Sequence, residues 1–172
     1  VLEGLLRLRQ IACDPRLVDP ESRVKSAKMM LLIEKLKVDV IENHKALVFS
    51  QFTSLLKLVA QELEAEGYEY TYLDGSTRDR QKVIESFTED EDKKIFLISL
   101  KAGGVGLNLT QADYVFHLDP WWNPAAQEQA TARAHRMGQK NTVMNFKLIA
   151  TGTVEEKILE LQEQKKNLFK KI

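Results

Sequence analysis

The sequence predicts an α/β protein built around a parallel β-sheet. Short runs rich in Val, Ile, Phe and Tyr alternate with segments of helical length, which is the order expected of βαβ units. Apolar residues make up 44% of the chain and charged residues 29%, as in a soluble globular protein. With 172 residues, the chain has the length of one domain with a substantial core.

The helices are predicted from apolar residues that recur at helical spacing. The first helix begins the chain and carries Leu2, Leu5, Leu6 and Ile11 on its apolar side. Two prolines in residues 13–22 then indicate a linker. A second helix is expected over 26–43, with Met29, Leu32, Ile33, Leu36 and Val40 on one side. Further helices are expected near 53–66, 79–88 and 124–137, and from Thr153 to the end.

Five apolar runs are predicted to be the strands of the sheet. They lie at 46–50, 68–73, 95–99, 113–118 and 143–150. The last helix is expected to place Val154, Ile158, Leu161, Leu168 and Ile172 on a common face. Its C-terminal lysines suit the helix dipole, so a solvated end is favoured there over a DNA-binding role.

Composition excludes several classes of protein. The 25 basic and 25 acidic side chains cancel, so a polyanion would have to be attracted by a local patch of charge. Cys13 is the sole cysteine, which excludes an internal disulfide and a cysteine-based zinc site. No apolar run approaches the ~20 residues of a membrane helix. The chain begins at Val1 within a helical pattern and lacks an initiator methionine, so we expect a piece of a longer polypeptide.

Ligands of open parallel sheets gather beyond the carboxyl ends of the strands, and the residues that follow these strands are chemically distinctive. They include Ser50 and Gln51, the turn from Asp74 to Thr77, Ser99 with Lys101, and Asp119 with two tryptophans. Trp121 and Trp122 are adjacent in an extended segment and point to opposite sides. We expect Trp121 to cover the core and Trp122 to lie outside it.

Three glycines follow the third strand, at Gly103, Gly104 and Gly106. Glycine costs roughly 1 kcal/mol relative to alanine inside a helix, so this cluster suits a close approach of the backbone to a ligand. A tight turn from strand to helix is the other interpretation. Ser76 likewise lies in a turn that leads into a capped helix, where its hydroxyl has a capping role available.

The predicted helix over 124–137 carries a basic stripe. Gln129, Arg133 and Arg136 are four and three residues apart, which stacks them along one helical stripe beside the apolar stripe of Ala126, Ala130, Ala134 and Met137. Two guanidinium groups converging without acids suggest a phosphate ligand. Ion pairs with carboxylates on a neighbouring element are the alternative. The three histidines are far apart in the sequence, and metal binding has little support.

Several motifs together carry a resemblance to a known family. In order along the chain they read FSQF, LDGSTRDR, SLKAGGVGLNL, DPWWNP and QATARAHRMGQ. In this order and spacing they resemble the second motor lobe of the Swi/Snf-type DNA translocases, within helicase superfamily 2. The opening LLRLRQIACDP and the final helix look like the elements that flank this lobe. The residues of the motifs DPWWNP and ARAHRMGQ disfavour an RNA helicase lobe of the same superfamily.

The resemblance implies a RecA-like fold, a three-layer sandwich of the type found in P-loop NTPases, and half of an ATP site. It implies that Arg133 and Arg136 act as arginine fingers on the phosphates. Gln129 and Gln139 belong to the same motif, and the resemblance places Gly103, Gly104 and Gly106 near the nucleotide. It further implies contacts to the DNA backbone from Ser50, Gln51, Ser76, Ser99, Lys101 and Trp122.

The resemblance also implies three regions: 1–25 as a helix and linker from the side of the first lobe, 26–152 as the RecA-like lobe, and 153–172 as a bracing helix. The phosphate-binding lysine loop and the acidic motif that holds Mg²⁺ belong to the first lobe of the family, so the isolated chain is expected to hydrolyse essentially no ATP. The expected partners are double-stranded DNA and that first lobe, with no membrane, in the cytoplasm or nucleoid of a bacterium or the nucleus of a eukaryote. A non-catalytic DNA- or protein-binding module derived from a helicase lobe remains the alternative.

Overall fold

A computed structural model describes residues 1–103 and 107–171 of the chain, and its centre is a five-stranded sheet in which every pairing is parallel. The strand order is β2-β3-β1-β4-β5. The strands are β1 (Ala46–Ser50), β2 (Thr71–Leu73), β3 (Ile95–Ser99), β4 (Tyr114–His117) and β5 (Met144–Lys147). The predicted α/β class is confirmed, and each predicted strand is present, although β2, β4 and β5 are shorter than their apolar runs.

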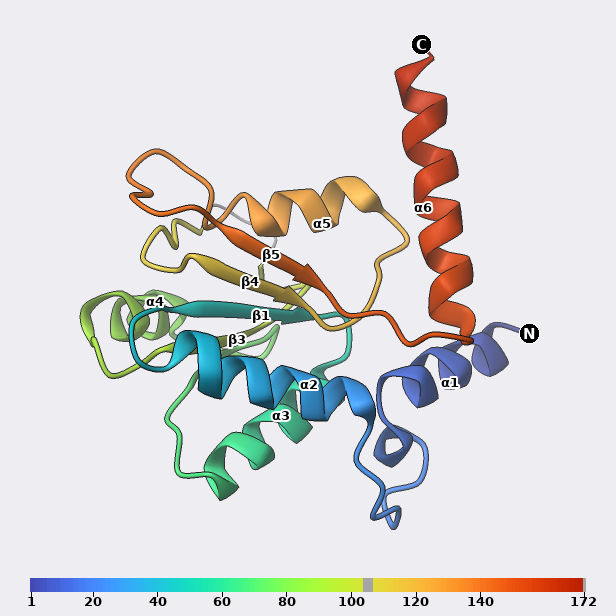
Figure 1. The fold of residues 1–172 in the computed structure, drawn as a ribbon, viewed down its shortest axis with the longest axis horizontal. Coiled ribbons are helices and arrows are strands. Elements are labelled where there is room, and N and C mark those ends of the chain that lie inside the picture. The colour runs from blue at the N-terminus through green and yellow to red at the C-terminus, as the bar shows by residue number, and fades with distance from the viewer. Residues whose placement is uncertain (104–106, 172) are drawn as a thin grey trace.

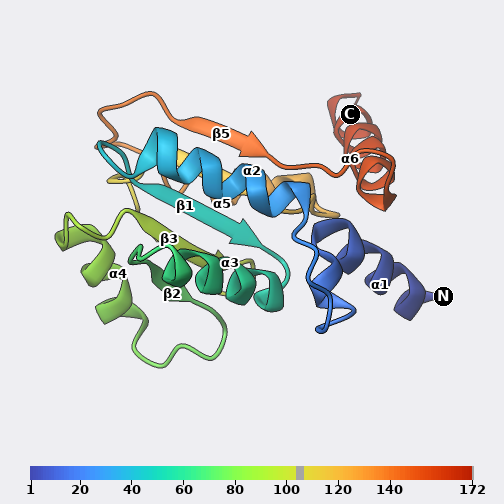
Figure 2. The ribbon, with the colours of Figure 1, turned by 60° about the horizontal axis from the view of Figure 1, so that its bottom comes forward.

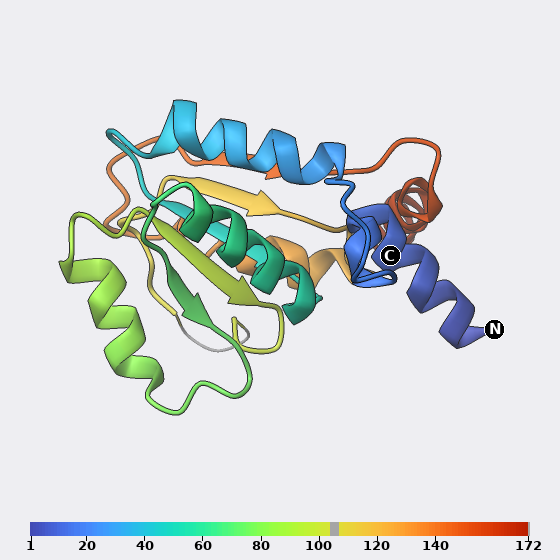
Figure 3. The same ribbon diagram turned by 90° about the horizontal axis from the view of Figure 1, so that it is seen from below.

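Helices cover both faces of the sheet (Figures 1 and 2). One face is covered by α2 (Ala27–Lys35), which continues into the π-helical η2 (Leu36–Val40), and by α3 (Thr53–Ala65). The other face is covered by α4 (Arg80–Glu89) and α5 (Pro124–Thr131). The view from below looks onto the face that α2 and α3 cover, with α5 behind the sheet (Figure 3).

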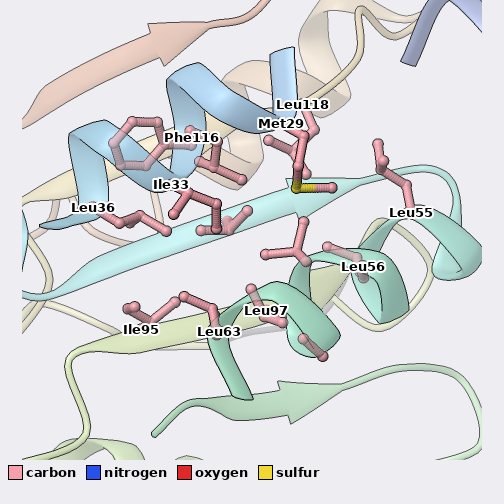
Figure 4. Close-up of a cluster of buried hydrophobic side chains, with 14 of the residues drawn as sticks. Met29, Ile33, Leu36, Leu55, Leu56, Leu63, Ile95, Leu97, Phe116 and Leu118 are labelled. Carbon is pink, nitrogen blue, oxygen red and sulfur yellow. The ribbon is translucent and has the colours of Figure 1, made fainter. Parts of the chain in front are cut away.

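Alternation along the strands builds two cores. In β1, Ala46 and Val48 join the cluster beneath α2 and α3, whereas Leu47 and Phe49 join the cluster beneath α4 and α5. Figure 4 shows the first cluster, where Met29 and Ile33 of α2 and Leu56 and Leu63 of α3 surround the strand residues. All of the apolar residues predicted to share one side of the second helix are buried: Met29, Leu32, Ile33, Leu36 and Val40.

Side-chain caps fix where several helices begin. Ser26 accepts a hydrogen bond from the amide of Met29 at the start of α2, and Asp79 accepts one from Lys82 at the start of α4. Asn123 accepts one from Ala125, and Pro124 follows as the first residue of α5. The predicted starts of these helices are therefore confirmed.

The predicted end of the helix over 124–137 is wrong, because α5 ends at Thr131. Beyond it, the amides of Arg133 and Ala134 bond to the carbonyls three residues earlier, and the carbonyl of Arg133 accepts from the amide of Leu109. This tertiary bond competes with continued α-helix. Gln129, Arg133 and Arg136 consequently do not form one helical stripe, and Met137 is 98% exposed, not buried.

Two helices flank the sheet at the end where its strands finish (Figure 1). They are α1 (Leu2–Cys13), which is followed by the 3₁₀ turn η1 (Pro15–Leu17), and α6 (Val154–Lys170), which is capped by Thr153. The predicted apolar stripe of α1 is largely exposed, at Leu2, Leu6 and Ile11. Among the residues described, no helix is both long and apolar enough to cross a membrane.

The common apolar face predicted for the last helix is buried only in part, because Ile158 is 1% exposed but its predicted neighbours are not all covered. Leu161 and Leu168 are exposed, and Ile172 lies outside the described residues. The residues that α6 buries are Glu155, Ile158 and Gln162. A search for hydrophobic periodicity cannot find this face, because two of its three members are polar and are satisfied by hydrogen bonds.

Candidate functional site

A cavity of about 50 Å³ lies on the α5 side of the sheet, beside the carboxyl ends of the central strands. It is lined by Phe49, Leu100, Gly103, Trp121, Ala126, Gln129, Ala130 and Arg133. The strand order changes direction at β1, which places this cavity at the switch point where open parallel sheets bind ligands. The fold therefore brings Gly103, which follows the third strand, beside Gln129 and Arg133 of the later basic motif.

Arg133 is a buried cation at the wall of this cavity. Arg133 is only 7% exposed, and its Nε is buried without a hydrogen-bond partner. Within the described residues, no carboxylate forms a salt bridge with Arg133 or Arg136 (salt bridges involve Arg7 and Arg16 instead). Burial first, and then the charge of Arg136, lower the pKa of Arg133 below its ordinary value. An arginine nevertheless keeps its proton, so its charge is buried here without a carboxylate partner among the described residues, a setting that suits an anionic ligand.

The other arginine has a different environment. Arg136 is exposed and does not line the cavity, although its charge reaches Arg133. The structure thus gives the two guanidinium groups different surroundings: Arg133 at the cavity wall and Arg136 at the surface beside it.

The two glutamines of the same motif are also separated. Gln129 is exposed and lines the cavity. The amide of Gln139 donates to the carbonyls of Thr110, Ala112 and Ala134, at 3.1, 2.7 and 3.1 Å. Its donors are committed to the fold, so Gln139 positions the turn after α5 and has no N–H free for a nucleotide.

Gly103 is the described member of the glycine cluster. A Cβ at Gly103 would lie 3.2 Å from Cε1 of Phe49 and 3.4 Å from Cγ2 of Ile98, so a side chain there would press on two strands. The missing side chain keeps this backbone against the sheet and at the cavity wall. The other two predicted positions, Gly104 and Gly106, lie outside the described residues.

A second polar group surrounds Asp119, just beyond β4. Its Oδ1 accepts from Oγ of Ser50 at 2.6 Å, and its Oδ2 accepts from Nε2 of Gln51 at 3.0 Å. Burial raises the pKa of Asp119 to about 6, although the bond from Ser50 opposes the shift. Ser50 has no exposed surface, and Gln51 also accepts from Nη2 of Arg9 in α1 at 2.9 Å. Ser50 therefore orders this edge of the sheet from within, whereas the half-buried Gln51 is held at the edge by Asp119 and Arg9.

The remaining residues predicted to face DNA lie in different environments. Lys101 and Ser76 are exposed, and the hydroxyl of Ser76 donates to Asp74 at 2.6 Å. Ser99 is buried, and its hydroxyl accepts from the amide of Ala102. Trp122 is half-buried beneath Arg9, whose guanidinium carbon is 5.8 Å from the centre of the ring.

Trp121 and Trp122 separate as expected. Trp121 is 1% exposed and packs edge-on against Phe49 and His117. His117 is buried, and its Nε2 lies 2.9 Å from Oγ1 of Thr131 at the end of α5. Burial lowers the pKa of His117 to about 3, so the ring is neutral at physiological pH.

Several residues that shape the site carried no signal in the sequence. Gln127 of α5 and Gln162 of α6 are buried and joined by a hydrogen bond of 3.0 Å. A glutamine in an amphipathic helix is ordinarily assigned to the solvent face, so only the folded structure identifies this pair. In the part of the chain that the structure describes, no three His, Cys, Asp or Glu side chains are grouped to hold a metal ion.

The fold and the site define a class of protein. A parallel RecA-like sheet presents a buried, unpaired arginine, a close backbone approach and a polar glutamine around one small cavity at its switch point. These features define an α/β lobe with a RecA-like sheet and a candidate anion site, and the comparisons with known proteins place it in a family.

Residues 27–138 match the helicase conserved C-terminal domain, and the chain belongs to that family as a Swi/Snf-type C-terminal lobe of superfamily 2. It is 45% identical over 147 residues to the DNA repair protein RAD5B of Arabidopsis thaliana. The matched residues make up 84% of this chain and 11% of that protein. It is 44% identical over 156 residues to the ATP-dependent helicase rhp16 of Schizosaccharomyces pombe, covering 88% of this chain and 18% of the relative.

A solved structure agrees with these relatives. The C-terminal part of the Fun30 ATPase domain superposes with a TM-score of 0.76 at 37% identity, covering 91% of this chain and 54% of that one. This likeness confirms the RecA-like fold. The chain spans less than a fifth of the length of the curated relatives named above.

Proposed function

We propose that this chain is the second motor lobe of an ATP-dependent translocase that moves along double-stranded DNA. Arg133 and Arg136 serve as arginine fingers, and the lobe is inactive alone. Bound ATP would supply the phosphoanhydride bond whose hydrolysis drives the motor. The observation that carries the proposal is the buried guanidinium of Arg133, which has an unpartnered Nε and no described carboxylate beside it.

The surroundings of Arg133 fit a phosphate group. Loss of water strengthens its interaction with any charge in the cavity, and the fixed backbone on both sides limits its movement. Arg136 adds a second positive charge at the exposed rim, and Gln129 offers a neutral amide at the same wall. The two guanidinium groups would neutralise charge that develops during phosphoryl transfer, and the amide of Gln129 would donate a hydrogen bond to it.

The size of the cavity supports half of a shared site. Its volume of about 50 Å³ is far below the roughly 300–1,000 Å³ of a complete small-molecule site. We therefore propose that a first motor lobe of the same polypeptide supplies the other wall, together with the residues that hold Mg²⁺. The described residues of this chain offer no grouped ligands for that ion.

The DNA contacts of the proposal divide into two kinds. Lys101, Ser76, Gln51 and Trp122 have surface available for the phosphate backbone, whereas Ser50 and Ser99 support that edge from within. Contacts to phosphates suit a motor that moves on any sequence. Closure of the two lobes on ATP and their reopening after hydrolysis would shift the grip along one strand.

The three regions of the chain have separate parts in this proposal. Residues 1–25 lead from the first lobe, 26–152 form the RecA-like lobe, and 153–172 brace it. The buried contacts of Glu155 and Gln162 support a bracing role for α6. The place of action would be the nucleoid of a bacterium or the nucleus of a eukaryote.

The test is DNA-stimulated ATP turnover in the polypeptide that carries both lobes. Arg133→Ala should lower kcat by about a thousandfold or more, because an arginine finger contributes on this scale. Arg133→Lys should also be defective, since an ammonium cannot reproduce the planar fork. The matched control is Arg23→Ala, at an exposed arginine of the linker. Near-normal turnover of Arg133→Ala would refute the finger, and DNA binding by a wild-type protein without ATP turnover would favour the non-catalytic module.

A further inference from the structure

The C-terminal helix α6 reaches the short helix that precedes Arg133 through a buried amide pair. Gln162 is 2% exposed, and its Nε2 donates to Oε1 of Gln127 at 3.0 Å and to the carbonyl oxygen of Trp121. Gln127 is equally buried, and its Oε1 also accepts from the amide of Trp121 at 3.5 Å. One side chain of α6 therefore holds both α5 and the segment that leads into it.

The contact belongs to a continuous stripe along α6. Glu155, Ile158, Gln162 and Lys166 follow one another at spacings of three, four and four residues, so they share one face of the helix. Glu155 pairs with Lys28 at 2.5 Å and fixes the first turn to the lobe. Two turns past Glu155, Gln162 meets Gln127, and one turn further Lys166 pairs with Glu128 at 3.1 Å. Figure 1 shows α6 rising beside the start of α5.

A short path connects Gln127 to Arg133. The carbonyl of Gln127 accepts from Oγ1 of Thr131 at 3.4 Å, and the same hydroxyl lies 2.9 Å from Nε2 of His117. Two residues later, the carbonyl of Arg133 accepts from the amide of Leu109 at 3.0 Å. A helix of eight residues has little stability of its own, so the place of α5 depends on such tertiary contacts.

We propose that Gln162 is a positioning residue for Arg133: through Gln127 it holds α5 in the place from which the guanidinium borders the nucleotide cavity. The inference rests on the proposed function, because it assigns to α6 a part in ATP hydrolysis. Gln162 does not line the cavity, so its effect on turnover must pass through α5.

The first measurement is amide hydrogen exchange in this chain. Gln162→Leu removes the donor while keeping a side chain of similar size. The matched control is Gln164→Leu, at an exposed position of the same helix. The amides of Ala132, Arg133 and Leu109 should exchange about tenfold faster in Gln162→Leu than in the control, while amides of α3 keep their rates. Unchanged exchange around Arg133 would overturn the positioning role and leave the proposed function standing.

The second measurement is a double-mutant cycle on DNA-stimulated ATP turnover with both lobes present. Gln162→Leu should lower kcat by about tenfold to a hundredfold with little change in KM for ATP, the scale of a misplaced catalytic group. In an Arg133→Ala background the same change should cost less than about twofold, because its target is gone.

The cycle separates positioning from a general loss of stability. A purely structural role for Gln162 would lower turnover equally in both backgrounds, and that result would overturn the inference. Near-normal turnover of Arg133→Ala alone would instead refute the arginine finger, and this inference would fall with it.

Discussion

Lys28 of α2 and Glu155 of α6 form a buried ion pair with Nζ and Oε1 2.5 Å apart, across 127 positions of sequence. Lys28 also donates to the carbonyl of Leu118 at 2.6 Å, and Glu155 accepts from the amide of Ala150 at 2.8 Å. The pair joins the C-terminal helix to the end of β4 and to the chain after β5. Through Leu118, the pair also contacts the residue that directly precedes Asp119.

Removing one member of this pair should destabilise the fold strongly. Glu155→Gln leaves the ammonium of Lys28 buried without its counter-charge, and we expect a loss of about 3–5 kcal/mol in the free energy of unfolding by urea. Lys28→Met together with Glu155→Gln should recover part of that loss, because neither member of the pair is then left as a buried charge without its partner. Additive losses in the double variant would contradict this account of the pair.

The two glutamines of the arginine motif should have different effects when replaced. Gln139→Leu removes the donor to three carbonyls and should lower the free energy of unfolding by about 1–3 kcal/mol, measured by thermal denaturation. Gln129 is exposed, so Gln129→Leu should change the free energy of unfolding by less than about 0.5 kcal/mol. In the two-lobe enzyme, Gln129→Leu should raise KM for ATP by about tenfold. A Gln139→Leu variant as stable as the wild type would contradict the assignment of Gln139 to the fold.

The stability of the fold should fall with acid through His117. Its pKa is about 3 in the folded chain and 6.5 ordinarily, so only the unfolded state takes up a proton between these values. Protonation then favours unfolding, and stability decreases as pH falls below 6.5. Relative to His117→Phe, the wild type should lose about 2 kcal/mol more between pH 6.5 and pH 5, measured by urea denaturation. His135→Gln, at an exposed histidine, is the control and should keep the wild-type slope.

The sequence predicts the sheet well because its signals are local. Apolar runs such as 46–50 and 95–99 coincide with strands, and caps such as Ser26 and Asn123 coincide with helix starts. Parallel strands that are buried on both faces need apolar residues throughout, which makes them visible without any knowledge of the fold.

The errors arise where tertiary hydrogen bonds decide the structure. The amide of Leu109 donates a hydrogen bond to the carbonyl of Arg133, close to the residue where α5 ends and a tighter turn follows. Hydrophobic periodicity does not predict that bond. Gln162 is buried because Gln127 and the backbone of Trp121 satisfy its amide. In the candidate site, Gly103, Gln129 and Arg133 line one cavity and Arg136 does not, and nothing in the sequence indicates that the amide of Gln139 is committed to the fold.

The charge of Lys101 should be visible in the salt dependence of DNA binding. Lys101 follows β3 and is exposed at the edge of the sheet where the proposed DNA contacts lie. Each phosphate that a lysine neutralises steepens the fall of log K with log salt by about 0.9, so Lys101→Gln should reduce the slope by about that amount. The measurement is fluorescence anisotropy with duplex DNA between about 50 and 200 mM salt, on the two-lobe polypeptide.

The matched control for this slope is Lys140→Gln. Lys140 is also exposed but precedes β5, so it lies toward the amino ends of the strands, away from Lys101. Its replacement should leave the slope unchanged, because a contact counts only when it displaces ions condensed on the DNA. Equal reductions for both lysines would indicate attraction by overall charge, and an unchanged slope for Lys101→Gln would remove that residue from the interface. Because the chain carries 25 basic and 25 acidic side chains, a difference between the two variants would point to a local contact.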